Sequence, residues 1–243
     1  NITPDQIYAW SDANKTTPKT SAPALADAME LFRPYAEAGR EIVCFSISAG
    51  MSTSGNVMRL AAEELGASDR IKVIDSANLS TGIGLLVVEA AIMAKNNRTA
   101  SQIVSEIEKL KPNVRASFVV DTLTYLYRGG RCNAVAAMAG GVLKLHPRIV
   151  VEDGAMNASK KYRGKIASVV MNYVKDMEKD LKNARPERVF ITHSGCKQET
   201  VEKVRAYLEE LGVFDEILET RAGGVISSHC GPGTLGVLYI AKS

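Results

Sequence analysis

The sequence has few cysteines, and their spacing does not suggest a metal or redox site. Four cysteines occur in 243 residues, at positions 44, 132, 196 and 230, and no two of them form a C-x-x-C pair. Zinc ribbons and thioredoxin-like sites need such closely spaced pairs. The three histidines are scattered as well, so we expect no metal site. Cys44 lies in an apolar run, where we expect a small buried hydrophobic residue.

Long hydrophobic runs and a strong excess of charge are also missing. The longest apolar run covers residues 83–88 and resumes at Ala90 after Glu89, whereas a membrane span needs about 20 apolar residues. Residues 1–20 are polar, so no signal peptide is visible. The net charge is only +3, without a dense basic run, which argues against nucleic-acid binding. We therefore expect a protein of the reducing cytoplasm with no nucleic-acid partner.

The remaining composition is that of an ordinary globular protein. Hydrophobic residues make up 46% and charged residues 23% of the chain, close to the averages for folded soluble domains. This apolar content argues against a disordered chain. The length fits one large domain or two of ordinary size.

The first half of the sequence alternates between helix and strand patterns. A helix is expected from about residue 23, capped by Thr20 or Ser21 and ended by Gly39. The further patterns predict strands at 41–48 and 71–75 and helices at 53–65, 81–95 and 100–110. Such alternation favours parallel strands covered by helices. We therefore expect residues 1–113 to form a layered, Rossmann-like α/β domain with mainly parallel strands.

The pattern changes near residue 113. We expect strands at 116–120, 148–151, 155–162, 188–192, 216–220 and 234–240. A short helix is expected to end at Tyr127, and further helices are expected at 134–139, 165–183 and 199–211. The Asp153-Gly154 step predicts a hairpin turn between two of these strands. Adjacent strands indicate a mixed or antiparallel sheet. Residues 114–243 are therefore expected to form a second, α+β domain.

Four polar clusters interrupt this pattern at the ends of elements, where binding residues are common. They are residues 19–23 (KTSAP), 48–56 (SAGMSTSGN), 128–131 (RGGR) and 223–233 (GGVISSHCGPG). Three of the clusters have a purely structural alternative: the first two can cap helices, and the third can end one. A purely structural or regulatory module therefore stays open.

The second cluster favours an anion, because it follows a strand and opens a helix. Free backbone N–H groups at a helix start attract negative charge, and the hydroxyls of Ser52, Thr53 and Ser54 add donors. The cluster is not a Walker loop, since it has no Gly-Lys-Ser/Thr. It also lacks the Gly-x-Ser-x-Gly pattern of a nucleophile elbow.

The fourth cluster contains His229 between serines and a Gly-Pro-Gly turn, a context unlike that of a core residue. Histidine can donate to an anion or act as a base. The clusters together supply hydroxyls, an arginine and a histidine without a well-placed carboxylate pair, which favours anion recognition. A serine hydrolase or acyl transferase is the alternative, with Ser52, His229 and either Asp75 or Asp121 as the triad.

At these clusters the sequence resembles the DegV family of bacterial fatty-acid-binding proteins. The resemblance runs from Ile2 to the C-terminus and depends on the order of several motifs. These are residues 18–23 (PKTSAP), 48–56, 73–76 (VIDS), 118–131 (FVVDTLTYLYRGGR) and 228–236 (SHCGPGTLG). Each motif is loose alone, and their joint presence makes the match specific.

The resemblance implies two α/β domains with a long-chain fatty acid in a tunnel between them. It also implies a carrier without catalytic residues or cofactor, whose ligand is phosphorylated by a partner fatty-acid kinase for phospholipid synthesis. By motif, Thr20 and Ser52 would hydrogen-bond the carboxylate, with His229 beside it. Arg131 would lie near the tunnel mouth or the partner surface. Ser21, Thr53 and Ser54 complete the expected ligand-binding set, and a transient contact with a membrane surface stays open.

Two departures from the family pattern affect these expectations. The family usually has Leu-Ser-Gly-Thr where this sequence has Met51-Ser52-Thr53-Ser54, with a glycine at position 55. The serine of the motif is retained, but the local backbone differs. The family also usually opens with a strand ending in Asp-Ser-Thr-Ala-Asp. We expect that this part of the first sheet is cleaved, supplied separately, or disordered and outside the numbering.

Overall fold

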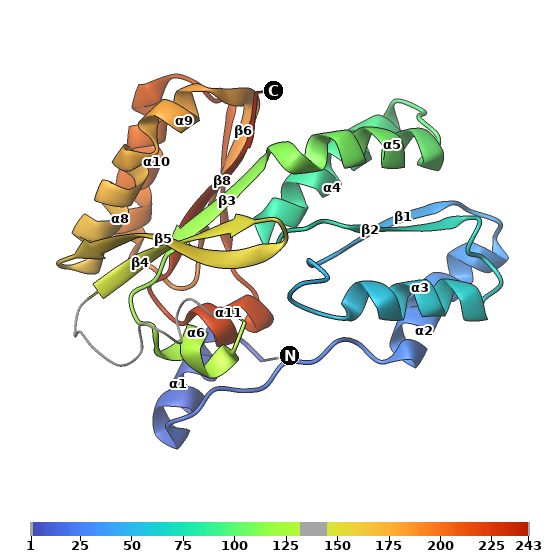
Figure 1. Cartoon of the computed structure of the whole chain (residues 1–243), viewed down its shortest axis with the longest axis horizontal. Coiled ribbons are helices and arrows are strands. Elements are labelled where there is room, and N and C mark those ends of the chain that lie inside the picture. Colours follow the sequence, from blue (N-terminus) through green and yellow to red (C-terminus); the bar gives the residue numbers. More distant parts are fainter. Residues whose placement is uncertain (1, 132–144, 243) are drawn as a thin grey trace. The chain divides into compact units, whose positions relative to one another are not determined.

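The computed structural model describes residues 2–131 and 145–242. The helix expected at 134–139 and the cysteine at position 132 lie outside the described residues. The chain forms two compact units (Figure 1). We call Asn1–Thr20, Asn113–Glu152 and Met156–Ser243 the larger unit, and Ser21–Pro112 with Asp153–Ala155 the smaller unit. These units differ from the expected domains at residues 1–20, 113 and 153–155.

The smaller unit has three layers, with a two-stranded sheet in the middle. The parallel strands are β1 (Ile42–Ser46) and β2 (Ile71–Asp75), and Ile42 is in register with Ile71. The helices are α2 (Leu25–Glu37), α3 (Ser54–Glu64), α4 (Thr81–Lys95) and α5 (Ala100–Leu110), followed by the 3-10 turn Lys111–Asn113. Helices α2 and α3 cover one face of the sheet, and α4 and α5 cover the other (Figure 1).

The larger unit is built on a six-stranded mixed sheet with the order β5-β4-β3-β8-β6-β7. The strands are β3 (Val114–Val119), β4 (Leu145–Glu152), β5 (Ala155–Arg163), β6 (Ala184–His193), β7 (Glu216–Arg221) and β8 (Leu235–Ala241). Strand β8 pairs antiparallel with both β3 and β6, whereas β6 and β7 are parallel. Because β6 and β7 are parallel, their C-terminal residues His193 and Arg221 lie side by side at the same end of the sheet.

Helices cover one face of this sheet. They are α8 (Ile166–Asp176), α9 (Glu178–Lys182) and α10 (Gln198–Leu211). Side chains of α8 and α10 form a core with the sheet in which Tyr173 and Leu208 are fully buried. The Tyr173 hydroxyl donates to the Ser117 carbonyl and accepts from the Val237 backbone N–H, so this buried polar group is satisfied.

Three short helices lie together in the larger unit, apart from this core. They are α1 (Pro4–Asn14), α6 (Thr124–Gly129) and α11 (Gly224–Cys230), and α11 packs against both of the others (Figure 1). A capping box between Thr3 and Gln6 begins α1. Ile7 and Tyr8 of α1 are buried against Tyr125 of α6. This contact explains why the first residues of the chain belong to the larger unit.

The fold confirms the expected class: a layered α/β unit with parallel strands and a second unit with a mixed sheet. The predicted bounds of β2, α4 and α5 are confirmed at residues 71–75, 81–95 and 100–110. The predicted hairpin is also confirmed. Its turn residues Asp153 and Gly154 both have positive φ, at 50° and 74°, as the tight turns between antiparallel strands require.

Three local predictions were wrong. The helix expected over 165–183 is broken at Met177, whose φ of −89° and ψ of 1° end α8 and begin α9. The capping of α2 by Thr20 or Ser21 does not occur, because its N-cap is Ala24 and has no side-chain hydrogen bond. The loop expected over 223–233 contains α11, the helix that carries His229.

Candidate functional site

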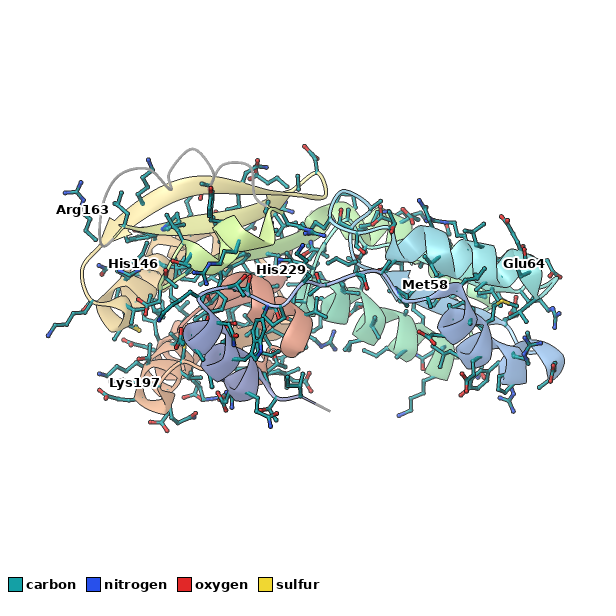
Figure 2. The ribbon with its side chains drawn as sticks, turned by 90° about the horizontal axis from the view of Figure 1, so that it is seen from below. Met58, Glu64, His146, Arg163, Lys197 and His229 are labelled. Atoms are coloured by element: carbon teal, nitrogen blue, oxygen red, sulfur yellow. The ribbon has the colours of Figure 1, made fainter. Side chains whose placement is uncertain are left out.

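His229 lies at the end of α11, in the group of short helices of the larger unit (Figure 2). Its neighbours on the helix are tied down: the Ser228 hydroxyl donates to the Gly224 carbonyl, and the Ser227 hydroxyl donates to the Ala222 carbonyl. Ser227 and Ser228 are both buried. The two serines beside His229 are therefore occupied by backbone contacts. The His229 ring instead contacts a residue of another polar cluster.

Thr20 is the partner of this ring. Its Oγ1 lies 2.7 Å from His229 Nε2, across 209 positions of sequence. Both residues belong to the larger unit. Thr20 does not cap α2, and its hydroxyl contacts His229 instead. This contact brings the first and fourth sequence clusters together. Lys19 and Ser21 on either side are exposed.

The Arg-Gly-Gly-Arg cluster forms the other wall around His229. Gly130 ends α6 in the left-handed conformation with a φ of 64°, as a glycine after a helix commonly does. Arg131 turns back and donates to the Gly129 carbonyl at 2.8 Å. Gly129 itself is buried and faces the His229 ring. The third and fourth clusters therefore meet at one place.

A second glycine permits the close approach of α11 to α6. Gly231 follows α11 with a φ of 74° and a ψ of 173°, a backbone conformation that residues other than glycine rarely adopt. A Cβ at this position would lie 2.5 Å from Cδ2 of Tyr125. Gly129 and Gly231 are thus the two positions at which the helices carrying this site have no room for a side chain.

The environment of His229 favours its neutral form. Burial lowers the pKa of the imidazole below its ordinary value, and the charge of Arg131 lowers it further. The structure gives Nδ1 of this ring no hydrogen-bond partner. At neutral pH the ring is therefore an uncharged group, able to donate from one nitrogen and accept at the other.

The second sequence cluster lies in the smaller unit and is organised by Asp75 at the end of β2. The Asp75 carboxylate accepts from the backbone N–H groups of Ala49 and Ala77. Ser48 is buried, and its hydroxyl donates to the Gly154 carbonyl at 2.6 Å while accepting from the Gly50 N–H. The start of the loop is thus fixed by its own side chains, and Asp75 is occupied by backbone contacts.

The later hydroxyls of this cluster pair with each other. Ser52 Oγ lies 2.8 Å from Ser54 Oγ and accepts from the Ser54 backbone N–H. Thr53 is the N-cap of α3 without a side-chain cap, and it is exposed. Gly55 is needed because a Cβ there would lie 2.7 Å from Ser46 Oγ. The glycine that departs from the family pattern therefore lets α3 approach β1.

The structure brings together three of the seven predicted ligand-binding residues within the larger unit: Thr20, Arg131 and His229. The other four, Ser21, Ser52, Thr53 and Ser54, belong to the smaller unit, in which Ser52 and Ser54 form a hydrogen-bonded pair. Sequence reasoning missed Gly129. The double glycine was a signal at this position, but it indicated a helix end and not a close contact with the His229 ring.

The hydrolase alternative lacks its carboxylate at His229. Asp121 Oδ1 lies 3.8 Å from Nδ1 of a different histidine, His146, whose two ring nitrogens also contact the carbonyls of Val120 and Gly164. Asp75 is held by backbone amides. Neither ring nitrogen of His229 contacts a carboxylate, which a catalytic triad requires.

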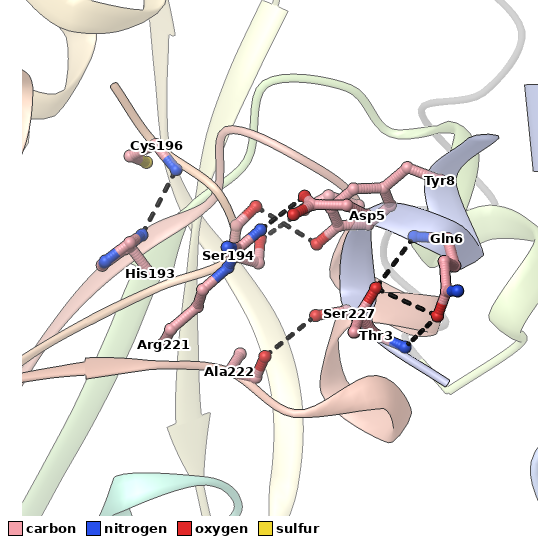
Figure 3. A network of polar contacts seen from close by, with 11 residues as sticks. Thr3, Asp5, Gln6, Tyr8, His193, Ser194, Cys196, Arg221, Ala222 and Ser227 are labelled. Carbon is pink, nitrogen blue, oxygen red and sulfur yellow. Dashed lines mark hydrogen bonds and ion pairs between the residues drawn. The ribbon is translucent and has the colours of Figure 1, made fainter. Parts of the chain in front are cut away.

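A different polar network joins α1 to the edge of the sheet (Figure 3). Arg221 at the end of β7 pairs with Asp5, and the Tyr8 hydroxyl donates to the Ser194 carbonyl at 3.1 Å. Beside these contacts is a cleft of about 490 Å³ lined in part by His193 and Cys196. Burial raises the pKa of the Cys196 thiol to about 12, which disfavours the thiolate form. The contacts of Asp5 and Tyr8 with Arg221 and Ser194 hold α1 against the end of the sheet.

Within residues 2–131 and 145–242, no group of three or more His, Cys, Asp or Glu side chains is arranged to hold a metal ion. None of the described helices has the length and apolar character to cross a membrane.

Comparison with known families identifies the chain. The model of the DegV family, described as uncharacterised proteins, matches residues 1–242. The chain belongs to the DegV family. A DegV domain-containing protein of Deinococcus radiodurans is 30% identical over 238 residues, which cover 96% of this chain and 81% of the relative. One of Clostridium perfringens is 33% identical over 219 residues, covering 88% and 75%.

Solved DegV structures share the fold. A DegV family protein from Thermus thermophilus, described with fatty-acid binding, is 27% identical with a TM-score of 0.89, covering 100% of this chain and 85% of that one. A stearic-acid-binding protein from Eubacterium ventriosum is 28% identical with a TM-score of 0.83, covering 99% and 84%. Fatty-acid binding is thus a described property of structurally similar DegV proteins.

Proposed function

We propose that this protein binds a long-chain fatty acid and presents its carboxylate to a partner fatty-acid kinase. The observation that carries the proposal is the contact between Thr20 Oγ1 and His229 Nε2, with Arg131 bonded to the carbonyl of Gly129, which faces that ring. These groups are hydrogen-bond donors or a positive charge, and no carboxylate contacts the ring. Such a set suits an anion. The fatty acids described for the relatives from Thermus thermophilus and Eubacterium ventriosum supply the ligand class.

The energetics favour a ligand with a long apolar tail and a modest polar head. Burial of one methylene contributes roughly 0.8 kcal/mol, so a chain of about 14 methylenes offers on the order of 11 kcal/mol before costs. A buried carboxylate costs several kcal/mol unless it is hydrogen-bonded. In the proposal Thr20 and Ser52 meet that need, supported by Ser21, Thr53 and Ser54. The tunnel between domains stays a prediction from the resemblance.

Native mass spectrometry tests the binding step. The protein purified from a bacterial host should carry an adduct with the mass of a fatty acid, and a delipidated sample should regain one on addition of oleate or palmitate. Burial of the tail gives an affinity high enough to survive purification. Absence of an adduct in both samples would refute the proposal.

The kinase step has its own test. In the proposal the γ-phosphoryl group of ATP passes to a carboxylate oxygen of the bound fatty acid, which yields an acyl phosphate and ADP. Hydroxylamine traps an acyl phosphate as a hydroxamate. We expect hydroxamate only when fatty acid, ATP, this protein and a fatty-acid kinase are all present. A product formed without the kinase would show that this chain is itself catalytic.

A fluorophosphonate probe separates the carrier from the hydrolase alternative. The carrier proposal predicts no covalent labelling of Ser52, because this hydroxyl pairs with Ser54 and His229 lacks a carboxylate partner. Labelling of Ser52 that is lost in Ser52→Ala would favour the hydrolase. Transient contact with a membrane surface, a location in the cytoplasm and a role in phospholipid synthesis remain parts of the proposal.

A further inference from the structure

The position of Gly129 restricts where the His229 ring can carry its hydrogen. An ideal Cβ on Gly129 would overlap Nδ1 and would lie 3.2 Å from both Cε1 and Cγ, the two ring atoms bonded to Nδ1. Equal distances to these two atoms place the added Cβ midway between them, and both distances exceed the one to Nδ1. The Cβ therefore lies outside the ring, close to the axis on which a hydrogen or lone pair of Nδ1 points. In glycine this direction is occupied by an α-hydrogen. The Nδ1 axis therefore meets a C–H group.

A C–H group can donate a weak hydrogen bond to a lone pair, but it offers no acceptor to another hydrogen. A hydrogen on Nδ1 would point at the glycine α-hydrogen and would have no acceptor, in agreement with the lack of any partner at this atom. A lone pair on Nδ1 forms a weak, favourable contact with the same C–H. The positive charge of Arg131, which folds back onto the Gly129 carbonyl at 2.8 Å, also favours a lone pair in its vicinity.

We propose that Gly129 is a positioning residue that holds His229 in the tautomer with its hydrogen on Nε2, so that the Thr20 hydroxyl is turned into a donor for the ligand. With the hydrogen on Nε2, the histidine donates to Thr20 Oγ1 across 2.7 Å. A threonine hydroxyl has one hydrogen. Since the hydroxyl oxygen is already an acceptor from His229, its hydrogen is free to point away from the ring.

The opposite tautomer would give the opposite specificity. If Nε2 carried the lone pair, Thr20 would donate to it and would offer only lone pairs to a ligand, which would repel a carboxylate oxygen. The tautomer thus selects an acceptor such as an ionised carboxylate. This step rests on the proposed function for the identity of the ligand, but the tautomer is a property of the unliganded protein.

Nuclear magnetic resonance of the ¹⁵N-labelled imidazoles measures the tautomer directly. The protein has three histidines, and loss of one signal set in His229→Gln assigns the ring. At neutral pH without ligand, we expect an unprotonated Nδ1 and a protonated Nε2 for His229. A hydrogen on Nδ1, alone or together with one on Nε2, would overturn the inference whether or not fatty acid binds.

Gly129→Ala tests the positioning role, with Gly223→Ala as its matched control. Gly223 is the N-cap of α11, the helix that carries His229, and has a φ of −73°. A Cβ added at Gly223 would meet no atom within 4 Å. Displacement of the ring by the methyl group that Gly129→Ala adds should remove the neutral hydrogen bond that orients the Thr20 hydroxyl and weaken palmitate binding by about twofold to tenfold, the range for an ordinary hydrogen bond. Gly223→Ala should leave affinity unchanged. Equal affinity of the two variants would contradict the inference.

A conservative replacement separates the hydrogen bond from simple packing. His229→Gln retains an amide N–H where Nε2 donates, whereas His229→Leu fills space without a donor. We expect the Gln variant to bind palmitate more tightly than the Leu variant; equal binding would refute the donor role. Should Gly129→Ala fail to fold, this pair and the wild-type spectrum still decide the inference. Absence of palmitate binding in a wild type with the expected tautomer would count against the proposed function alone.

Discussion

Two hydroxyl pairs in the molecule, Thr20 with His229 and Ser52 with Ser54, are built in different ways. Ser52 and Ser54 are two positions apart, and their contact forms within a single loop of the smaller unit. Thr20 and His229 are 209 positions apart, and their contact needs the folded larger unit. A local pair can arise from helix capping or loop geometry alone. A long-range pair forms only when the fold brings distant segments together, here with close packing at Gly129 and Gly231. The Thr20–His229 pair is therefore a stronger indication of a binding site than the Ser52–Ser54 pair.

The largest expected effect tests the close packing that holds the long-range pair. Gly231→Ala should lower the free energy of unfolding by about 3 kcal/mol, because backbone strain and overpacking each cost about 1 to 3 kcal/mol. The new Cβ would lie 2.5 Å from the Tyr125 ring. Urea unfolding followed by circular dichroism measures the change.

Gly212→Ala is the matched control for that variant. Gly212 also has a positive φ, of 62°, but an added Cβ would meet no atom within 4 Å. Its cost should be the conformational part alone, about 1 kcal/mol. Equal destabilisation of the two variants would show that the contact between α11 and α6 is not close enough to matter.

The next effect compares the two hydroxyl pairs in ligand binding. Thr20→Val should weaken palmitate affinity by about tenfold to a hundredfold, because it removes a donor to a charged group. Ser52→Ala should weaken it less, by about twofold to tenfold, because the neighbouring Ser54 hydroxyl can donate to the carboxylate in its place. Displacement of a fluorescent fatty acid measures both.

Ser101→Ala serves as the control for these variants, because this exposed side chain of α5 lies outside the proposed ligand-binding set and should make little difference to affinity. A stronger effect for Ser52→Ala than for Thr20→Val would reverse the comparison and place the main carboxylate contact in the smaller unit. Unchanged affinity in both variants would remove these residues from the site.

A third prediction concerns stability within the smaller unit. Ser48→Ala should lower the free energy of unfolding by about 1 to 3 kcal/mol, the cost of leaving a buried partner such as the Gly154 carbonyl without its hydrogen bond. Ser52→Ala should cost less, since Ser52 is only half-buried. Thermal unfolding of the two variants at one pH compares them. Equal costs would mean that Ser48 does not fix the start of the loop.

The smallest effect is a pH dependence of stability. Burial, the main cause, lowers the pKa of both His193 and His229 below the ordinary value of 6.5. The folded state therefore binds fewer protons than the unfolded chain once the pH falls below about 6.5. The stabilisation is complete above that pH and is lost as the pH falls toward the folded values.

His229→Gln should flatten this decline between about pH 6.5 and pH 5, above the range in which carboxylates titrate. Chemical unfolding across that range measures the slope in wild type and variant. A stability that increases as the pH falls through this window would contradict the lowered values, and an unchanged slope would remove His229 from the effect.

Much of the smaller unit could be predicted from local sequence. The bounds of β2, α4 and α5 follow from patterns that a single segment contains, such as the apolar stripe of residues 100–110 closed by Pro112. The break at Met177 could not be predicted in this way. Residues 165–183 have a continuous helical pattern, and the break depends on packing in the core of the larger unit, where Met177 is fully buried.

The candidate site shows the same limit. The motif resemblance named Thr20, Arg131 and His229, which the larger unit brings together. It did not name Gly129, because a glycine next to a helix end already has a local explanation. The role of Gly129 is visible only when a ring from 100 positions further along the chain lies against it. Local reasoning also assigned Thr20 to a helix cap, which the structure replaces with a long-range contact.

A crystal structure of the protein with bound palmitate tests the central claim most directly. We expect electron density for an acyl chain whose carboxylate oxygen accepts a hydrogen bond from Thr20 Oγ1, with His229 Nε2 still donating to the same Thr20 oxygen. Density for the carboxylate away from Thr20, or no ligand at saturating palmitate, would contradict it.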